Sequence, residues 1–362
     1  MSESDRQGIE RRDLILGAAA LPIVASMGGF SPASAQTQLT DKPSYHLVAP
    51  ELLPGLGKLP STDYDAKALA EVRKAGLGGP PPALSADQQT VQQKILHIPS
   101  LFHAPDVRVL IYTPPGAALR RPAYLDIHGG GYILGAADAS DALNRTLALQ
   151  HNCVVLSVDY RLAPETRYPG QVEDCYTALT WLHSHADELG IDRARIAIGG
   201  ASAGGGLAAS LALFARKRGG PPICLQVLMA PMLDDRTGSS NPVPPFRGDF
   251  IWTPASNRFG WRSLLGVEPG GPDVPIEAAP GRARDLSSLP PAFISVGVLD
   301  LFLDENMDYM RRLANRGVPA ELHVIPGAYH GFGLAGDQAP QVREENDLRN
   351  SAIARGFQSV SH

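Results

Sequence analysis

The chain has 362 residues, of which 44% are hydrophobic and 19% charged, and 32 Lys and Arg against 37 Asp and Glu give a formal net charge of −5. This composition excludes disorder as the main state, because the chain has enough apolar residues to bury a large core. The slightly negative charge lacks the excess of basic residues that binding to nucleic acid requires. Three cysteines are too few and too far apart for a disulfide scaffold or a CxxC metal site, so we interpret Cys153, Cys175 and Cys224 as buried core residues.

Residues 1–35 have the features of an export signal. Arg11 and Arg12 precede a short apolar run that glycine and proline interrupt, and small residues at 33–35 offer a cleavage site. The pattern is typical of a bacterial twin-arginine signal peptide and predicts a periplasmic or secreted protein, although acidic residues outweigh the arginines before the apolar run. The alternative is an N-terminal membrane anchor. It needs about 20 apolar residues, more than this run has, so no stable membrane anchor is expected.

After residue 35, short β-branched apolar runs alternate with longer amphipathic stretches. The runs predict strands at 94–98, 107–112, 124–127, 153–158, 196–199, 224–229, 292–298 and 320–325. The stretches predict helices at 138–150, 171–189, 202–218 and 304–316. Because the strands are apolar without interruption, helices should cover both faces of the sheet. The sequence therefore predicts an α/β fold with a mostly parallel sheet of about eight strands.

Residues 233–285 break this alternation. The segment is rich in proline, glycine and aromatic residues, and it lies between two expected strands where a simple crossover needs far fewer residues. One interpretation is a surface excursion with a small core of its own. The interpretation that we favour is a cap inserted into a core domain of residues 91–362, which joins residues 36–90 over the carboxyl ends of the strands.

Ser202 lies in a G-x-S-x-G sequence at 200–204, between an expected strand and an expected helix. The glycines allow a sharp turn that would hold the Ser202 hydroxyl clear of the sheet, above the helix N-terminus. No lysine follows at the P-loop spacing, which excludes that phosphate-binding motif. We therefore predict Ser202 to be a catalytic nucleophile.

A serine nucleophile needs a base, a carboxylate that orients the base, and donors for the oxyanion. Asp300 follows one expected strand, and His330 lies in a glycine-flanked loop after the last one, so we predict Asp300 as the orienting carboxylate and His330 as the base. Asp304 and Glu305 fall in the following helix, where a solvated first turn or indirect support of the site is expected. The order Ser202, Asp300, His330 is that of α/β hydrolases.

The expected strand at 124–127 runs into His128 and the glycines 129–131. Glycines leave backbone N–H groups free to face an anion, so this loop should form part of an oxyanion hole. His128 precedes the serine in the chain and belongs to the loop itself. We therefore expect His128 to hold the loop by hydrogen bonding and not to act as the base.

Five motifs together resemble the hormone-sensitive-lipase family of α/β hydrolases, the bacterial esterase family IV. They are HGGG at 128–131, SVDYRLAPE at 157–165, GASAG at 200–204, GVLD at 297–300 with DE at 304–305, and YHGF at 329–332. The resemblance runs from about residue 94 to the C-terminus. It implies that Ser202 is the nucleophile, His330 the general acid and base, and Asp300 the orienting residue.

The resemblance also implies which backbone amides bind the oxyanion, namely those of Gly130, Gly131 and Ala203, with Gly129 serving the turn. It implies a helical cap made of the N-terminal segment and an insertion after the sixth core strand, in agreement with the lid inferred above. In the second motif, Asp159 and Glu165 are expected to brace the loops around the site. Ordinary contacts at a strand end would account for these two acidic residues as well.

The chain departs from the family pattern at Ala201, where many members have an acidic residue. The change removes a charge beside the nucleophile and leaves the backbone of the turn unaffected. Tyr132, beside the oxyanion loop, and Trp252, in the insertion, are expected to line the substrate pocket. A pocket closed by such aromatic residues has limited depth, so specificity should rise with acyl length and then fall. The resemblance implies that turnover lies among short to medium chains.

These features predict an exported serine carboxylesterase that cleaves short- to medium-chain carboxylic esters through an acyl-enzyme. No metal or organic cofactor is expected, and the expected partner is a small-molecule ester; the sequence leaves a homodimer open. One alternative is an amide or lactone hydrolase that uses the same triad. Another is a non-catalytic ligand-binding member of the fold, against which the complete triad argues.

Overall fold

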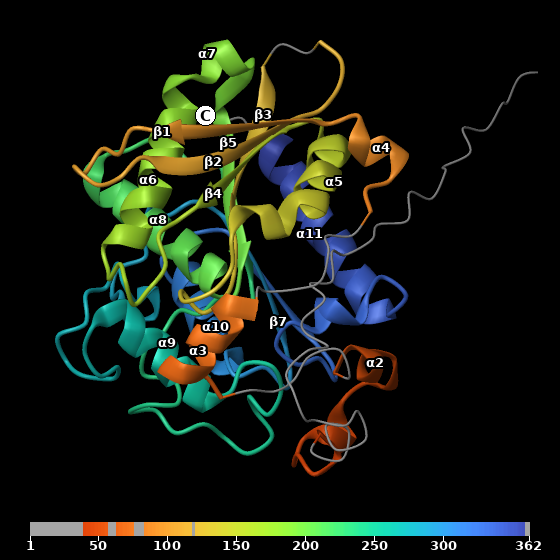
Figure 1. The fold of residues 1–362 in the computed structure, drawn as a ribbon, viewed down its shortest axis with the longest axis vertical. Helices are drawn as coiled ribbons and strands as arrows, with labels where there is room; N and C mark the ends of the chain where they lie inside the picture. The colour runs from red at the N-terminus through yellow and green to blue at the C-terminus, as the bar shows by residue number, and fades with distance from the viewer. Residues whose placement is uncertain (1–38, 57–62, 76–82, 118–119, 359–362) are drawn as a thin grey trace, which may run out of the picture.

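The computed structural model describes residues 39–56, 63–75, 83–117 and 120–358, so the expected signal segment lies outside the described residues. Its eight strands form one sheet in the order β1-β2-β4-β3-β5-β6-β7-β8 (Figure 1). The strands are β1 (Gln92–Ile98), β2 (Val107–Thr113), β3 (Arg121–Ile127), β4 (Val154–Asp159), β5 (Ile191–Ala201), β6 (Leu225–Met229), β7 (Ala292–Gly297) and β8 (Ala320–Ile325). This confirms the predicted α/β fold with eight strands.

The sheet is mostly parallel. Only β2 runs against its neighbours, β1 and β4, and every other adjacent pair is parallel. Strand β3 pairs with β4 on one side and β5 on the other, so the chain reverses its direction of winding there. Ligands of such sheets bind outside the carboxyl ends of the strands, beside such a reversal.

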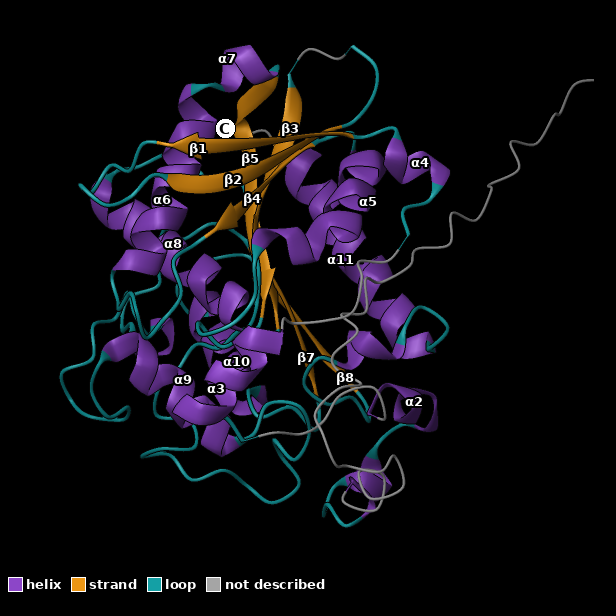
Figure 2. Ribbon diagram, in the orientation of Figure 1, coloured by secondary structure: helices purple, strands orange, loops and turns teal. Residues whose placement is uncertain are grey.

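Helices cover both faces of the sheet (Figure 2). The helices are α2 (Leu53–Leu56), α3 (Ala66–Ala75), α4 (Ala86–Gln89), α5 (Asp141–His151), α6 (Gly170–Ser184), α7 (Ala186–Leu189), α8 (Ala203–Arg218), α9 (Pro254–Leu265), α10 (Leu303–Ala314) and α11 (Pro340–Gln358). The short 3-10 helices are η1 (Tyr45–Leu47), η2 (Pro50–Leu52), η3 (Ala137–Ser140), η4 (Pro280–Arg282) and η5 (Phe332–Ala335). Helices α6, α8 and α10 pack on one face, and α5 and α11 on the other.

Alternating strand residues enter the two cores. In β2, Val109 and Ile111 belong to the core under α6 and α8, whereas Leu110 and Tyr112 belong to the core under α5 and α11. Both sets are buried, because residues two apart in a strand share a face and both faces are covered. The edge strand β1 differs from the prediction of uninterrupted burial, since most of its side chains are exposed.

The helix predictions were right for the main crossovers and incomplete elsewhere. The stretch 171–189 forms two helices, α6 and α7, because His185 interrupts the helix. The stretch 138–150 begins with η3 before α5. No bounds were predicted for α3 and α9, which lie in the two segments of the expected helical cap, and α11 was not predicted. The three cysteines all lie in the described part of the chain and are buried, as predicted.

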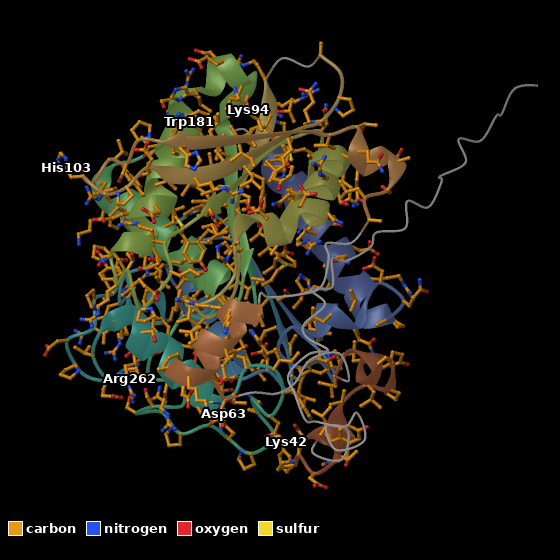
Figure 3. The ribbon with its side chains drawn as sticks, in the orientation of Figure 1. Lys42, Asp63, Lys94, His103, Trp181 and Arg262 are labelled. Atoms are coloured by element: carbon orange, nitrogen blue, oxygen red, sulfur yellow. The ribbon has the colours of Figure 1, made fainter. Side chains whose placement is uncertain are left out.

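The N-terminal segment and the insertion contact each other beside the carboxyl ends of the strands. The backbone N–H and hydroxyl of Ser44 both donate to Asp249, at 3.0 and 2.6 Å, and the N–H of Tyr64 donates to Ser256 Oγ at 3.1 Å. Asp63, which bonds Thr253, lies at the end of the molecule where α3 and α9 lie (Figure 3). These contacts join the two segments that were expected to form the cap, and a shared cap stays a prediction. In the part of the chain that the structure describes, no helix has the length and apolar character to cross a membrane.

Candidate active site

Ser202 lies at the sharp turn between β5 and α8. Its backbone has φ +56° and ψ −121°, a strained conformation for a residue with a side chain. The N–H of Ser202 donates to Met229 at 2.8 Å, and its carbonyl accepts from Gly206 at 2.9 Å and Met232 at 3.0 Å. These bonds hold the strained turn, and they leave the Ser202 hydroxyl at the carboxyl edge of the sheet.

The glycines of this turn are required by close backbone approach. A Cβ on Gly200 would lie 2.2 Å from the carbonyl oxygen of Ile127, and a Cβ on Gly204 would lie 2.0 Å from the same atom. The end of β3 therefore packs directly against the turn after β5. This packing brings the glycine loop after β3 beside Ser202.

The structure brings Ser202, His330 and Asp300 together from three strand ends. His330 Nε2 is 2.9 Å from Ser202 Oγ, and His330 Nδ1 is 2.8 Å from Asp300 Oδ2. The other oxygen of Asp300 accepts from the N–H of Phe302 at 2.9 Å, and the Phe302 ring packs edge-on against the imidazole. Asp300 is 1% exposed and His330 7%. The carboxylate is therefore fixed, shielded from water and aimed at the imidazole.

The loop after β3 is held by bonds to its carbonyl groups. The carbonyl of His128 accepts from Tyr160 Oη, and that of Gly129 accepts from His128 Nδ1. The carbonyl of Gly130 accepts from the N–H groups of Ile133 and Leu134, and that of Tyr132 accepts from the N–H of Ala163. Gly130 and Gly131 have φ of +118° and +59°, which suits glycine.

Three backbone amides near Ser202 are left without a protein acceptor. Among the described residues, none accepts a hydrogen bond from the N–H of Gly130, Gly131 or Ala203. Ala203 is the first residue of α8, where backbone N–H groups are unpaired and the helix dipole favours negative charge. Unpaired amides at a helix start and a glycine loop are suited to an anion.

His128 is built into the loop, and its ring makes no hydrogen bond to Ser202 or His330 within the described residues. Its Nδ1 is 2.8 Å from the carbonyl oxygen of Gly129, and its ring stacks on Tyr160 with 4.1 Å between centroids. Burial lowers the pKa of His128, which favours the neutral ring. These contacts match the loop-holding position expected from the sequence.

The structure places Tyr132 differently from the expectation that it lines the pocket. Its side chain is fully buried, its hydroxyl donates to Met232 at 3.0 Å, and its ring packs on Trp261. Tyr132 therefore supports the loop from inside. Trp252 does lie against the loop, since a Cβ on Gly131 would be 2.0 Å from its ring, and its Nε1 donates to Asn257.

For Glu305 the sequence left two interpretations open, a solvated first turn and indirect support of the site, and the structure shows contacts of the second kind. The Glu305 carboxylate is buried and accepts from the N–H groups of Leu233, at 2.6 Å, and Asp234, at 3.3 Å. Both residues follow Met232, whose backbone is hydrogen-bonded to Ser202 and to Tyr132. Glu305 therefore anchors a segment that contacts both the turn at Ser202 and the glycine loop. Burial raises the pKa of Glu305 well above its ordinary value, although its hydrogen bonds act to lower that pKa. Asp304, in contrast, is exposed and pairs with Arg247.

Asp126 is a second buried carboxylate that the motifs did not single out. It lies in β3, two residues before His128, and accepts from Asn144 Nδ2 at 3.0 Å and Ser157 Oγ at 2.8 Å. Burial raises its pKa despite these bonds. A lone acidic residue in an otherwise buried strand was the available signal.

Within the described residues, no three His, Cys, Asp or Glu side chains group as a metal site would require.

A hydrogen-bonded serine, histidine and aspartate at the carboxyl ends of a mostly parallel sheet is the arrangement of α/β hydrolases. Residues 124–334 match the Abhydrolase_3 family, described by its alpha/beta hydrolase fold, and the chain belongs to this family.

Known relatives agree with this assignment. The carboxylesterase NlhH of Mycobacterium tuberculosis is 36% identical over 305 residues, which cover 82% of this chain and 91% of the relative. Esterase LipI of the same organism is 34% identical over 300 residues, covering 77% and 93%. Among solved structures, a bacterial heroin esterase has a TM-score of 0.76 and 39% identity, and the match covers 87% of this chain and 99% of that one. The resemblance to the hormone-sensitive-lipase family is thus confirmed.

Proposed function

We propose that this protein is a serine carboxylic ester hydrolase in which Ser202, His330 and Asp300 form the catalytic triad. The observation that carries the proposal is the continuous hydrogen-bond chain from Ser202 Oγ through the His330 ring to the buried Asp300. Relatives named esterase and carboxylesterase, which this chain matches over most of its length, support the same reaction class.

In the first half of the reaction, His330 Nε2 takes the proton of Ser202 as Oγ attacks the ester carbonyl carbon. Asp300, bonded to Nδ1, holds the imidazole in the required tautomer and stabilises the imidazolium that forms. The negative charge on the former carbonyl oxygen is bound by the amides of Gly130, Gly131 and Ala203. His330 then gives its proton to the departing alcohol, which leaves an acyl-enzyme on Ser202.

In the second half, water takes the place of the alcohol. His330 removes a proton from the water as it attacks the acyl carbon, the same amides bind the oxyanion, and Ser202 leaves with the proton that His330 returns. The acid product departs and the free enzyme is restored. Every step uses groups of this chain and water.

The substrates that we propose are soluble esters of short- to medium-chain acids. The support is Trp252, which packs on Gly131 and limits the space beside the oxyanion donors. Ala201 leaves the surroundings of Ser202 without the acidic side chain of many relatives. Amide or lactone hydrolysis by the same triad is the other outcome that an assay of substrates would reveal. We also propose export through the twin-arginine motif at Arg11 and Arg12.

The direct test compares wild-type protein with Ser202→Ala on p-nitrophenyl acetate and butyrate. The variant should lose nearly all turnover while its unfolding midpoint stays close to that of wild type, because the change removes a single hydroxyl group from a partly exposed residue. A fluorophosphonate should label wild type and leave the variant unlabelled. Ester turnover that persists in the folded variant would contradict the proposal.

A further inference from the structure

Arg73 connects the N-terminal segment to the loops around Ser202. It lies in α3, outside the residues that match the family. Its Nε and Nη2 donate to the carbonyl oxygen of Ile133 at 3.0 and 2.8 Å, and Nη2 also donates to that of Ala163 at 2.6 Å. Nη1 donates to Glu165 at 2.7 Å. One guanidinium thus binds the glycine loop and the 157–165 motif together.

Both carbonyl groups depend on this side chain. Ile133 and Ala163 are fully buried, and in the described part of the chain no other group donates to either carbonyl oxygen. A buried carbonyl that loses its donor is costly, so removal of Arg73 would favour movement of both segments. The planar guanidinium reaches two carbonyls and a carboxylate at once, which a lysine ammonium on a single stem does not reproduce.

The bond to Ile133 is the first link of a chain of peptide groups that ends at an oxyanion donor. In a trans peptide, a carbonyl and the N–H of the next residue lie in one plane and point in opposite directions. The carbonyl of Ile133 therefore shares a plane with the N–H of Leu134, which donates to the carbonyl of Gly130 at 2.9 Å. The carbonyl of Gly130 in turn shares a plane with the N–H of Gly131.

The charge of Arg73 acts along the same chain. Hydrogen-bonded groups in series polarise one another, and the surroundings are largely buried, which strengthens such effects. A cation at the start makes the N–H of Leu134 a stronger donor to Gly130, and this makes the N–H of Gly131 a stronger donor to an anion. The two peptide planes also fix the direction of that N–H. Position and polarisation thus favour the same state, the one with negative charge beside Gly131.

We propose that Arg73 is a positioning residue for the oxyanion hole, acting on Gly131 through the peptide groups of Ile133 and Gly130. The inference rests on the proposed function, because it assigns the amide of Gly131 to the oxyanion. It makes a residue of the N-terminal segment part of the apparatus that stabilises the transition state. Its effect should appear where charge develops on the substrate and not where the substrate first binds.

The experiment measures kcat and KM for p-nitrophenyl butyrate in wild type, Arg73→Gln and Arg73→Lys, with the inhibition constant of an aryl boronic acid that forms a tetrahedral adduct with the serine. Loss of an oxyanion donor costs about 10²–10³ in kcat, and a misplacement of 1 Å costs about 10². We expect Arg73→Gln to lower kcat by about 10- to 100-fold with little change in KM, and to weaken boronic acid binding by a similar factor. Arg73→Lys should fall between the two.

Arg195→Gln is the matched control. The Arg195 side chain is 27% exposed, against 28% for Arg73, and it also bonds a carboxylate, Asp192, and a backbone carbonyl, that of Arg120. It lies in β5 far from the carboxyl end, so its loss should affect the unfolding midpoint and leave kcat and boronic acid binding unchanged.

The outcomes separate this inference from the proposed function. If Ser202→Ala is inactive and folded Arg73→Gln keeps the wild-type kcat, only the role of Arg73 is overturned; if Ser202→Ala turns over ester, the proposed function fails first. A fall in kcat without weaker boronic acid binding also overturns the role. Should Arg73→Gln fail to fold, Arg73→Lys decides, since an unchanged kcat and boronic acid affinity in that variant contradict the inference.

Discussion

Replacement of Glu305 should reveal how strongly the loop after β6 depends on one buried carboxylate. The side chain is 8% exposed and accepts from two backbone amides and the hydroxyl of Thr237. Glu305→Ala leaves these three donors without an acceptor, and each buried unpaired group costs about 1–3 kcal/mol. One of the bonds, to Asp234, is long at 3.3 Å. We therefore expect a loss of about 3 kcal/mol in the free energy of unfolding.

Glu305→Gln separates charge from shape. The amide oxygen can keep the bonds to Leu233 and Asp234, and its NH₂ group can donate to Thr237, whose hydroxyl can also accept. We therefore expect this variant to stay folded. The adjacent Asp304 is 64% exposed, so Asp304→Asn is a control for the loss of one negative charge at the start of α10.

The pH dependence has a definite sign. Because the pKa of Glu305 is raised in the folded state, the folded protein binds this proton more tightly than the unfolded chain does. The resulting stabilisation is fully present below the unfolded-state pKa of about 4.3 and is lost as pH rises through the folded-state pKa. The stability of wild type minus that of Glu305→Gln should thus fall as pH increases, by about 1.4 kcal/mol for each tenfold difference in proton affinity.

Urea unfolding of wild type, Glu305→Gln and Asp304→Asn at intervals between about pH 4.5 and 8 provides the measurement. The difference between wild type and Glu305→Gln should decrease with pH, whereas that between wild type and Asp304→Asn should stay nearly flat. A difference for Glu305→Gln that is constant or increases with pH would refute the reasoning, because the hydrogen bonds to the carboxylate would then outweigh its burial.

Three further predictions concern catalysis and export. Asp300→Asn should lower kcat by about 10⁴-fold without unfolding the protein, because the imidazole then takes the wrong tautomer, as it does in serine proteases, and pre-steady-state acylation rates would show the loss. Trp252→Ala should move the optimum of kcat/KM across p-nitrophenyl esters from acetate to palmitate toward longer chains; a wild-type maximum at palmitate with interfacial activation would indicate a lipase instead. Arg11→Lys with Arg12→Lys should keep active enzyme in the cytoplasm, and unchanged periplasmic activity after cell fractionation would argue against twin-arginine export.

The strands were predictable because sheet burial leaves a direct trace in the sequence. In β4 and β7 every interior position is buried from both faces, so the residues are mostly apolar. The loops at the ends of β3, β5, β7 and β8 were predictable for a different reason. Each carries a short sequence with glycines at positions where a side chain would clash with a neighbouring segment, as at Gly200, which packs against Ile127.

The elements without predicted bounds lack one of these signals. Helix α11 has few apolar residues for its length, and α9 lies in the expected helical cap, in a segment rich in proline and aromatic residues, where no helix bounds were predicted. Its start did carry a signal, since Thr253 caps the helix and Pro254 follows at the first position. Arg73 and Glu305 depend on partners 60 and 72 residues away in the chain. Charged residues with such distant partners look like surface residues in a sequence.

The N-terminal segment also contacts the loop that carries His330. The hydroxyl of Tyr329, next to His330, donates to the carbonyl of Leu52 at 2.9 Å, and a Cβ on Gly55 would lie 2.5 Å from that hydroxyl. Leu52 is fully buried against the loop after β8. Arg73 of the same segment donates to the carbonyl of Ile133 in the loop after β3. Two of the loops that meet at Ser202 are therefore bonded to a segment that precedes both the sheet and the residues of the family match.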